Sequence, residues 1–163
     1  PNIDNNILKS TFNINLNTVL GYHKNEEKYF FLILLDLDKF KMINDTYGHI
    51  VGDDALIQMA KILRMNCKKK QDYVSRLGGD EFVIIGQCSE IASVEVILDR
   101  LQTAVEAFNK NGKRQYQLQF SAGYTICDRG SEATLDTLIN EADQKMYRNK
   151  KKKKMMELLE KEG

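Results

Sequence analysis

The longest apolar run of the chain occupies residues 29–37 and reads YFFLILLDL. A near-continuous run of aromatic and aliphatic residues is typical of a central β-strand that is buried on both faces. Two acidic residues, Asp36 and Asp38, lie at the carboxyl end of this run. The pattern therefore predicts a core strand that ends in carboxylates.

Apolar residues then recur at intervals of three and four, which is the spacing of one helix face. This spacing predicts a short helix over 38–47 and a second helix over about 52–67. Asp53 and Asp54 are expected in the first turn of the second helix, where carboxylates interact favourably with the helix dipole.

Two strand-like stretches, DYVSRL at 72–77 and EFVIIG at 81–86, flank the residues GGD. Glycine adopts positive φ angles without a Cβ penalty, so this arrangement predicts a β-hairpin with a tight turn. Asp80 and Glu81 are expected at the tip of that hairpin.

The remaining pattern predicts a third helix over 89–109, a strand over 116–126 and a final helix from about 134 to 150, with Thr134 as its N-cap. The five lysines at 150–154 are interpreted as a solvated helix end. Helices and strands are thus interleaved, which indicates a mixed α and β class.

Composition limits the partners of the chain. Its 163 residues and 18.8 kDa correspond to one domain. With 24 Lys and Arg against 23 Asp and Glu, the net charge of +1 gives no whole-chain attraction for nucleic acid or an anionic membrane, so neither is expected as a partner. Three scattered cysteines indicate free thiols in a reducing compartment. The apolar run at 29–37 is far too short to span a bilayer. We therefore expect a cytoplasmic domain. The opening Pro1 suggests a piece of a larger signalling protein.

Asp36, Asp80 and Glu81 form the first chemical constellation, because neighbouring strands of one sheet would bring them together. Like charges at close range need a counter-charge, and Mg²⁺ (or Mn²⁺) prefers carboxylate oxygens together with water and substrate phosphates. A nucleoside triphosphate is the expected substrate. An ordinary hairpin turn with exposed acids remains the alternative at this point.

The string RLGGDEF, together with DLDKFKMINDTYGHIVGDDAL and EADQKMY, resembles the GGDEF domain of diguanylate cyclases over nearly all of residues 28–150. The resemblance implies an α/β (α+β) fold with a mainly antiparallel central sheet flanked by helices, similar to nucleotidyl cyclases and the polymerase palm, with a ferredoxin-like core. It also implies condensation of two GTP into cyclic di-GMP and two pyrophosphates at the interface of two facing domains, hence a homodimer.

The family resemblance assigns roles to the acidic residues and to one lysine. Asp36 and Asp80 would bind Mg²⁺ through their side chains, and Leu37 through its backbone carbonyl. Asp80 would also be the base for the attacking 3′-hydroxyl, and Glu81 would support the metal. Lys41 would stabilise charge in the transition state, although a solvated helix lysine is the alternative.

Asn44, His49 and Asp53 resemble the family's substrate contacts, with Asn44 and Asp53 at the guanine. A carboxylate accepts hydrogen bonds from guanine N1–H and the N2 amino group, whereas adenine N1 is an acceptor, so GTP is expected over ATP. Gly78 and Gly79 would leave room for the nucleotide. The alternative roles are a helix cap for Asn44, a turn residue for His49 and an acid at a helix N-terminus for Asp53.

Four basic or acidic positions carry further family roles, two of them altered. Lys150 matches a lysine that reaches the triphosphate, and Lys154 stands where the family usually has arginine. Lys69 and Asp72 fall on a product-binding inhibitory site whose arginine is here lysine. Since lysine lacks the planar bidentate fork of arginine, weak product inhibition is expected.

We expect an N-terminal connection at 1–25, a GGDEF domain at 26–155 and a charged tail at 156–163. The family's usual opening motif is replaced by TFNINLN at 11–17. With the altered lysines, this favours an alternative function: a weak or inactive domain that binds GTP or cyclic di-GMP and regulates an attached domain such as a phosphodiesterase. A purely structural pairing domain is the third hypothesis.

Overall fold

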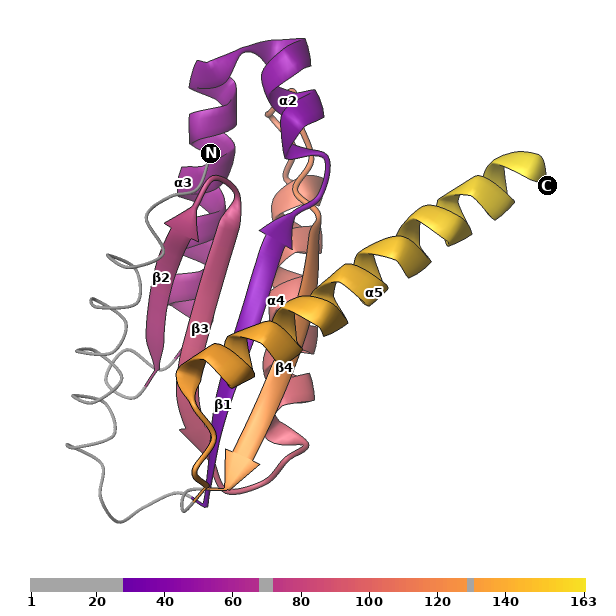
Figure 1. Cartoon of the computed structure of the whole chain (residues 1–163). Helices are drawn as coiled ribbons and strands as arrows, with labels where there is room; N and C mark the ends of the chain where they lie inside the picture. The colour runs from indigo at the N-terminus through magenta and orange to yellow at the C-terminus, as the bar shows by residue number, and fades with distance from the viewer. Residues whose placement is uncertain (1–27, 68–71, 129–130) are drawn as a thin grey trace.

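The computed structural model describes residues 28–67, 72–128 and 131–163. Its centre is a four-stranded sheet in the order β2-β3-β1-β4 (Figure 1). Every pairing among the described strands is antiparallel. The strands are β1 (Tyr29–Leu37), β2 (Tyr73–Gly78), β3 (Glu81–Cys88) and β4 (Phe120–Asp128).

Four helices complete the described part of the fold: α2 (Phe40–Tyr47), α3 (His49–Asn66), α4 (Ser93–Lys110) and α5 (Leu135–Glu162). Helices α3 and α4 pack against one face of the sheet and α5 crosses the other (Figure 1). The β-α-β-β-α-β order and this strand order are those of a ferredoxin-like core. The α+β fold expected from the sequence is therefore confirmed.

Strand β1 is buried on both faces, as its apolar run predicts. Phe31, Ile33 and Leu35 belong to the cluster under α3 and α4, whereas Leu32 and Leu34 belong to the cluster under α5. All five are at most 5% exposed. Burial of one such side chain contributes about 1.5–3 kcal/mol, so β1 is the main organising strand of both layers.

Helix α5 approaches β4 so closely that only glycine fits between them. A Cβ added to Gly123 would lie 2.2 Å from both the carbonyl oxygen of Ala142 and the amide nitrogen of Met146. Further along, the Asn149 amide donates to the carbonyl of Ala122 at 2.7 Å. These contacts fix the position of α5 along the strand.

Helix α3 begins at His49, three residues earlier than the pattern predicts. Gly48, at φ 92°, is enough to turn the chain from α2 directly into α3. The prediction that Asp53 and Asp54 lie in the first turn is therefore wrong. Asp54 instead joins α3 to the segment before β4, because its carboxylate accepts a hydrogen bond from the Tyr116 hydroxyl at 2.5 Å.

Residues 116–119 are not part of β4, which begins at Phe120. Leu118 is held by the side chain of Asn109 instead, which accepts from its N–H and donates to its carbonyl, both at 2.8 Å. This side chain supplies the hydrogen bonds that a strand ladder would otherwise provide.

Helix α4 starts at Ser93, four residues later than expected.

The last helix is longer than the pattern predicts. Thr134 caps it as expected, accepting a hydrogen bond from the Thr137 N–H at 3.2 Å. The helix then continues past Lys150, through the lysine run to Glu162, and its C-terminal part extends beyond the sheet (Figure 1). Within the described ranges, no helix has both the length and the apolar character needed to cross a membrane.

Candidate functional site

The end of β1 and the tip of the β2–β3 hairpin meet at one edge of the sheet. Asp36 pairs with Glu81 in the antiparallel register of β1 and β3. The Leu37 N–H donates a hydrogen bond to the carbonyl of Asp80 at 3.1 Å. The fold thus brings together the acidic residues that the sequence singles out as metal ligands.

The hairpin tip is a turn of Gly79 and Asp80 that depends on glycine. Gly78 and Gly79 have φ angles of 138° and 52°. The Arg76 Nε donates to the Gly79 carbonyl at 2.9 Å and braces the turn. No described atom lies within 4 Å of a Cβ built on Gly79, so the space beside this backbone is open to a ligand.

Asp36 is the most perturbed acid of the site. The residue is only 9% exposed, and burial followed by the neighbouring Asp80 carboxyl raises the pKa of Asp36 to about 7, against the opposing effect of Lys150. Its Oδ1 atom is buried and has no hydrogen-bond partner among the described residues. A buried carboxylate oxygen without a partner is energetically costly, and a bound ligand at this atom would remove that cost.

Glu81 feels the same concentration of negative charge. Although this residue is exposed, its pKa is raised, first because neighbouring atoms displace part of its water shell and then because of Asp36 and Asp143. Asp36 and Glu81, both with raised pKa values, thus lie beside a third carboxyl group, that of Asp80. Such a concentration of negative charge is typical of a cation site.

The donor set fits a hard divalent cation. A cation near Asp36 Oδ1 would satisfy that orphaned atom and offset the repulsion between Asp36 and Asp80. Within the part of the chain that the structure describes, no three His, Cys, Asp or Glu side chains form a complete ligand cluster. Mg²⁺ commonly binds one or two carboxylates and completes its shell with water and substrate phosphates, so two protein carboxylates are sufficient.

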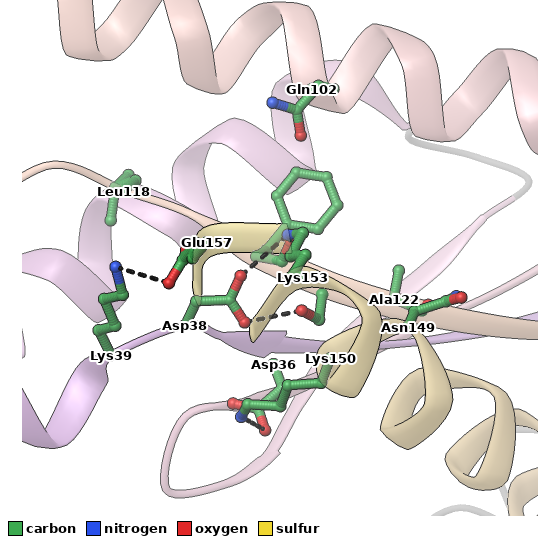
Figure 2. Close-up of polar contacts among 12 residues, drawn as sticks. Asp36, Asp38, Lys39, Gln102, Leu118, Ala122, Asn149, Lys150, Lys153 and Glu157 are labelled. Atoms are coloured by element: carbon green, nitrogen blue, oxygen red, sulfur yellow. Dashed lines mark hydrogen bonds and ion pairs between the residues drawn. The ribbon is translucent and has the colours of Figure 1, made fainter. Parts of the chain in front are cut away.

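Lys150 brings a positive charge from α5 to this edge. Its Nζ donates to Oδ2 of Asp36 at 2.8 Å (Figure 2). Burial alone would lower the pKa of Lys150, but Asp36, Asp38 and Asp80 together raise it. The ammonium group is thus held charged beside the acidic residues of the site.

A second ion pair beside the first was missed by the sequence reasoning. Asp38, 9% exposed, accepts from the Ser121 hydroxyl at 2.7 Å and from Lys153 Nζ at 2.9 Å (Figure 2). Lys153 also donates to the carbonyl of Phe120. Lys154, the residue expected at the triphosphate, is exposed on α5. Helical spacing from Lys150 does allow Lys153 to share its face, which is the signal that could have found it.

Of the four expected contacts on α2 and α3, Asn44, His49 and Asp53 lie near the junction of these helices, whereas Lys41 lies in the first turn of α2. Lys41, His49 and Asp53 are exposed. Asn44 is half-buried and rests against Gly52, where an added Cβ would lie 1.8 Å from the Asn44 Oδ1. The Asn44 side chain of α2 therefore lies against the residue of α3 that precedes Asp53, and Gly52 permits this contact because it has no side chain.

The expected inhibitory site is described only in part. Asp72 is half-buried, and its Oδ1 lies 2.4 Å from the position of a Cβ built on Gly86. Lys69 lies outside the described residues. The reading of this pair as an altered inhibitory site stays a prediction.

A four-stranded antiparallel α+β domain with paired acids at a hairpin tip defines the class of nucleotidyl-cyclase-like domains. Residues 7–156 match the family model described as "Diguanylate cyclase, GGDEF domain", and the chain belongs to this family. The diguanylate cyclase DgcP of Pseudomonas aeruginosa is 36% identical over 122 residues, which cover 74% of this chain and 18% of DgcP. The bifunctional diguanylate cyclase/cyclic di-GMP phosphodiesterase MucR of the same organism is 32% identical over 125 residues, covering 77% and 18%. The chain spans about a fifth of the length of these relatives.

Solved structures agree with the sequence comparison. The GGDEF domain of YfiN (TpbB) from Pseudomonas aeruginosa aligns with a TM-score of 0.75 at 26% identity, covering 88% of this chain and 83% of that one. The GGDEF domain of DgcB from Caulobacter crescentus, solved in complex with c-di-GMP, aligns with a TM-score of 0.72 at 22% identity, covering 87% and 84%. The second match supports the fold alone. The family resemblance read from the sequence is confirmed.

Proposed function

We propose that this domain condenses two GTP molecules into cyclic di-GMP, with release of two pyrophosphates, when two copies face each other. Family membership supports this reaction class. The observation that carries the proposal is the buried, unpartnered Oδ1 of Asp36 beside the Asp80 carboxyl. Such a pair is unfavourable in the ligand-free domain and favourable once a cation with a bound triphosphate is present.

The proposed chemistry is a nucleotidyl transfer. The 3′-oxygen of one GTP attacks the α-phosphorus of the other, the bond to pyrophosphate breaks, and the hydroxyl proton passes to the Asp80 carboxylate. Asp36, Asp80 and the Leu37 carbonyl would hold Mg²⁺ (or Mn²⁺), with Glu81 in support; the bound ion would neutralise phosphate charge. Lys41 would stabilise the charge of the transition state.

The same proposal places the rest of the nucleotide. Lys150 would exchange its contact with Asp36 for triphosphate oxygens, and Lys154 would add a second positive charge. Asn44 and Asp53 would read the guanine edge, with His49 nearby. The open side of Gly79 would admit the substrate backbone.

A turnover assay tests this function. The chain is incubated with GTP and Mg²⁺, and cyclic di-GMP is measured by chromatography. Asp80→Ala should abolish product, whereas Asp99→Ala, which removes an exposed carboxylate on α4, should not. Equal turnover by wild type and Asp80→Ala would refute the proposal.

A regulatory module is the second candidate. Lys154 replaces the arginine usual in the family and is exposed in the structure, which favours weaker binding of the triphosphate. The cyclic di-GMP phosphodiesterase PdeR of Escherichia coli is 30% identical over 117 residues, covering 71% of this chain and 17% of PdeR. Calorimetric binding of GTP or cyclic di-GMP without any turnover would favour this alternative.

We further propose a cytoplasmic setting with fused signalling domains.

A further inference from the structure

Helix α5 has one side that contacts the body of the domain. Lys150 contacts Asp36, Lys153 contacts Asp38, and Glu157 pairs with Lys39 at 3.4 Å. Figure 2 shows these three α5 side chains directed toward the end of β1. Positions 150, 153 and 157 follow helical spacing, so they define a single inward face.

The opposite side of α5 carries exposed apolar residues. Met155, Leu158 and Leu159 are 62%, 58% and 61% exposed. At 100° per residue, these three positions point away from the direction of Lys153 and Glu157. We call Lys151, Met155, Leu158, Leu159 and Glu162 the outward face. Large apolar side chains grouped on a projecting helix indicate a contact surface.

Charge is distributed asymmetrically along the same helix. Five lysines at 150–154 precede the apolar positions, while three glutamates and one lysine follow at 157–162. On the outward face itself, Lys151 stands one turn before Met155 and Glu162 stands one turn after Leu158. The face is therefore positive at one end, apolar in the middle and negative at the other end.

We propose that the outward face of α5 binds the same face of a second copy of this chain in antiparallel orientation. The charge pattern is self-complementary only in that orientation. It sets Met155 against Leu158 of the second copy and Lys151 against Glu162 of the second copy, and two-fold symmetry repeats each contact. A parallel pair would instead place lysines against lysines.

The charges disfavour an anionic membrane as the occupant. Basic amphipathic helices bind such surfaces when lysines flank the apolar residues. Here the segment that holds the apolar residues, 155–162, contains Glu157, Glu160 and Glu162 against Lys161 alone. On the outward face Lys151 is balanced by Glu162, so this face offers no net positive charge to anionic headgroups, whereas its two ends are complementary to those of an antiparallel second copy.

The inference goes beyond the proposed function, because this pairing needs neither nucleotide nor catalysis. A contact of a few helical turns is smaller than a stable interface of roughly 800 Å² per partner. We therefore expect a weak dimer that added salt dissociates, since the charge pairs at its ends are exposed.

Sedimentation equilibrium of the whole chain without nucleotide tests the surface. A dimer should form at about 100 µM in about 0.05 M salt and weaken by about tenfold in about 0.5 M salt. Met155→Ser and Leu158→Ser should each weaken it by about tenfold or more. Val96→Ser is the matched control, since Val96 is a 59% exposed apolar residue on α4, and it should leave the dimer unchanged.

Charge reversal tests the orientation. Lys151→Glu alone and Glu162→Lys alone should each reduce self-association, because like charges then meet at both ends, whereas an equimolar mixture should restore dimers. Cysteine variants complete the test: Met155→Cys mixed with Leu158→Cys should cross-link faster than either alone. Faster cross-linking of each variant with itself would indicate a parallel pair and overturn the proposal.

Two further outcomes would overturn the proposal. The chain could remain monomeric under all these conditions. It could also sediment with vesicles of anionic phospholipid, losing that binding in Lys151→Glu while staying monomeric, which would assign the face to a membrane. Loss of cyclase activity in the Asp80→Ala variant leaves the self-association measurement unaffected, so the two proposals fail separately.

Discussion

At the scale of single residues, the site is organised around the buried Asp36 carboxyl. Burial and Asp80 raise its pKa to about 7, and Lys150 only partly offsets these effects. One oxygen bonds the Lys150 ammonium and the other has no partner among the described residues. The residue is therefore a poor stabiliser of the fold and a good ligand for a cation.

Replacing the Asp36 carboxyl with an amide should weaken ligand binding without lowering the stability of the fold. Asp36→Asn removes a buried like-charge contact, so thermal unfolding without metal should occur at an unchanged or higher temperature. The same substitution should weaken Mg²⁺-dependent GTP binding by about 2 kcal/mol or more, measured by titration calorimetry. Asp45→Asn, on the exposed surface of α2, is the control and should change neither quantity.

Asp54 offers a prediction about acid stability. Its pKa is lowered, first by the hydrogen bond from Tyr116, with Gln58 and Arg114 acting in the same direction against partial burial. Because the folded pKa lies below the unfolded value near 3.9, this contribution is present above about pH 4 and is lost as pH falls through the folded value.

Urea unfolding across pH measures that effect. Asp54→Asn should lower the free energy of unfolding by about 1 kcal/mol at pH 7, a modest figure because the side chain is 40% exposed, and the difference from wild type should vanish in acid. Asp99→Asn is the control. A difference that stays constant from pH 7 to pH 3 would contradict the linkage.

At the scale of elements, the position of α5 determines which lysines reach the sheet. Gly123 permits its close approach, and Asn149, Lys150 and Lys153 bond β4 and the end of β1. The Asp38, Ser121 and Lys153 network therefore orients the helix that carries Lys150. Lys153 is a positioning residue, because its contacts are with the protein.

A pair of neighbouring lysines tests this role. Lys153→Gln should lower the free energy of unfolding by about 1–3 kcal/mol, because Asp38 stays buried with one charged partner lost. Lys154→Gln should leave stability within about 0.5 kcal/mol of wild type, because that side chain is exposed, yet should weaken GTP binding if it reaches the triphosphate. Equal stability loss in the two variants would contradict the assigned helix register.

Sequence reasoning found the elements that depend on local patterns. The apolar run of β1 and the glycine turn before Glu81 each carry their own signal, so the sheet edge with its acids could be predicted. Asp38 and Ser121 lie 83 residues apart, and no local signal joins them. Helical spacing from Lys150 allows both Lys153 and Lys154 to share its face, so the sequence does not decide between them, and the packing of α5 selects Lys153. The early start of α3 was missed because the apolar spacing of the second helix becomes regular only after Gly52, whereas Gly48 links the two helices directly.

At the scale of the whole molecule, the site is half of what the proposed reaction needs. One domain presents one set of carboxylates at a single edge of its sheet, whereas the product has two phosphodiester bonds. Each copy would supply one activated nucleotide to the other, so the rate depends on encounters between two intact domains.

Mixing experiments test this dependence. At fixed wild-type concentration, added Asp80→Ala protein should lower product formation, because it forms unproductive pairs with active copies. Specific activity of wild type alone should rise with protein concentration until pairing saturates. A rate per molecule that is independent of concentration, and unaffected by Asp80→Ala, would show that one copy suffices.

Under the proposed function, the contact of Lys150 with Asp36 would make metal binding an exchange of one cation for another. The folded domain carries its own resident cation at the carboxylate, tethered to α5 and always protonated at neutral pH. If the proposed metal binds at Asp36, Lys150 would leave that carboxylate and become free to contact the phosphates of the proposed substrate. The proposed function would thus link two charge neutralisations, and without a metal the Lys150 ammonium offsets part of the negative charge of the acidic residues.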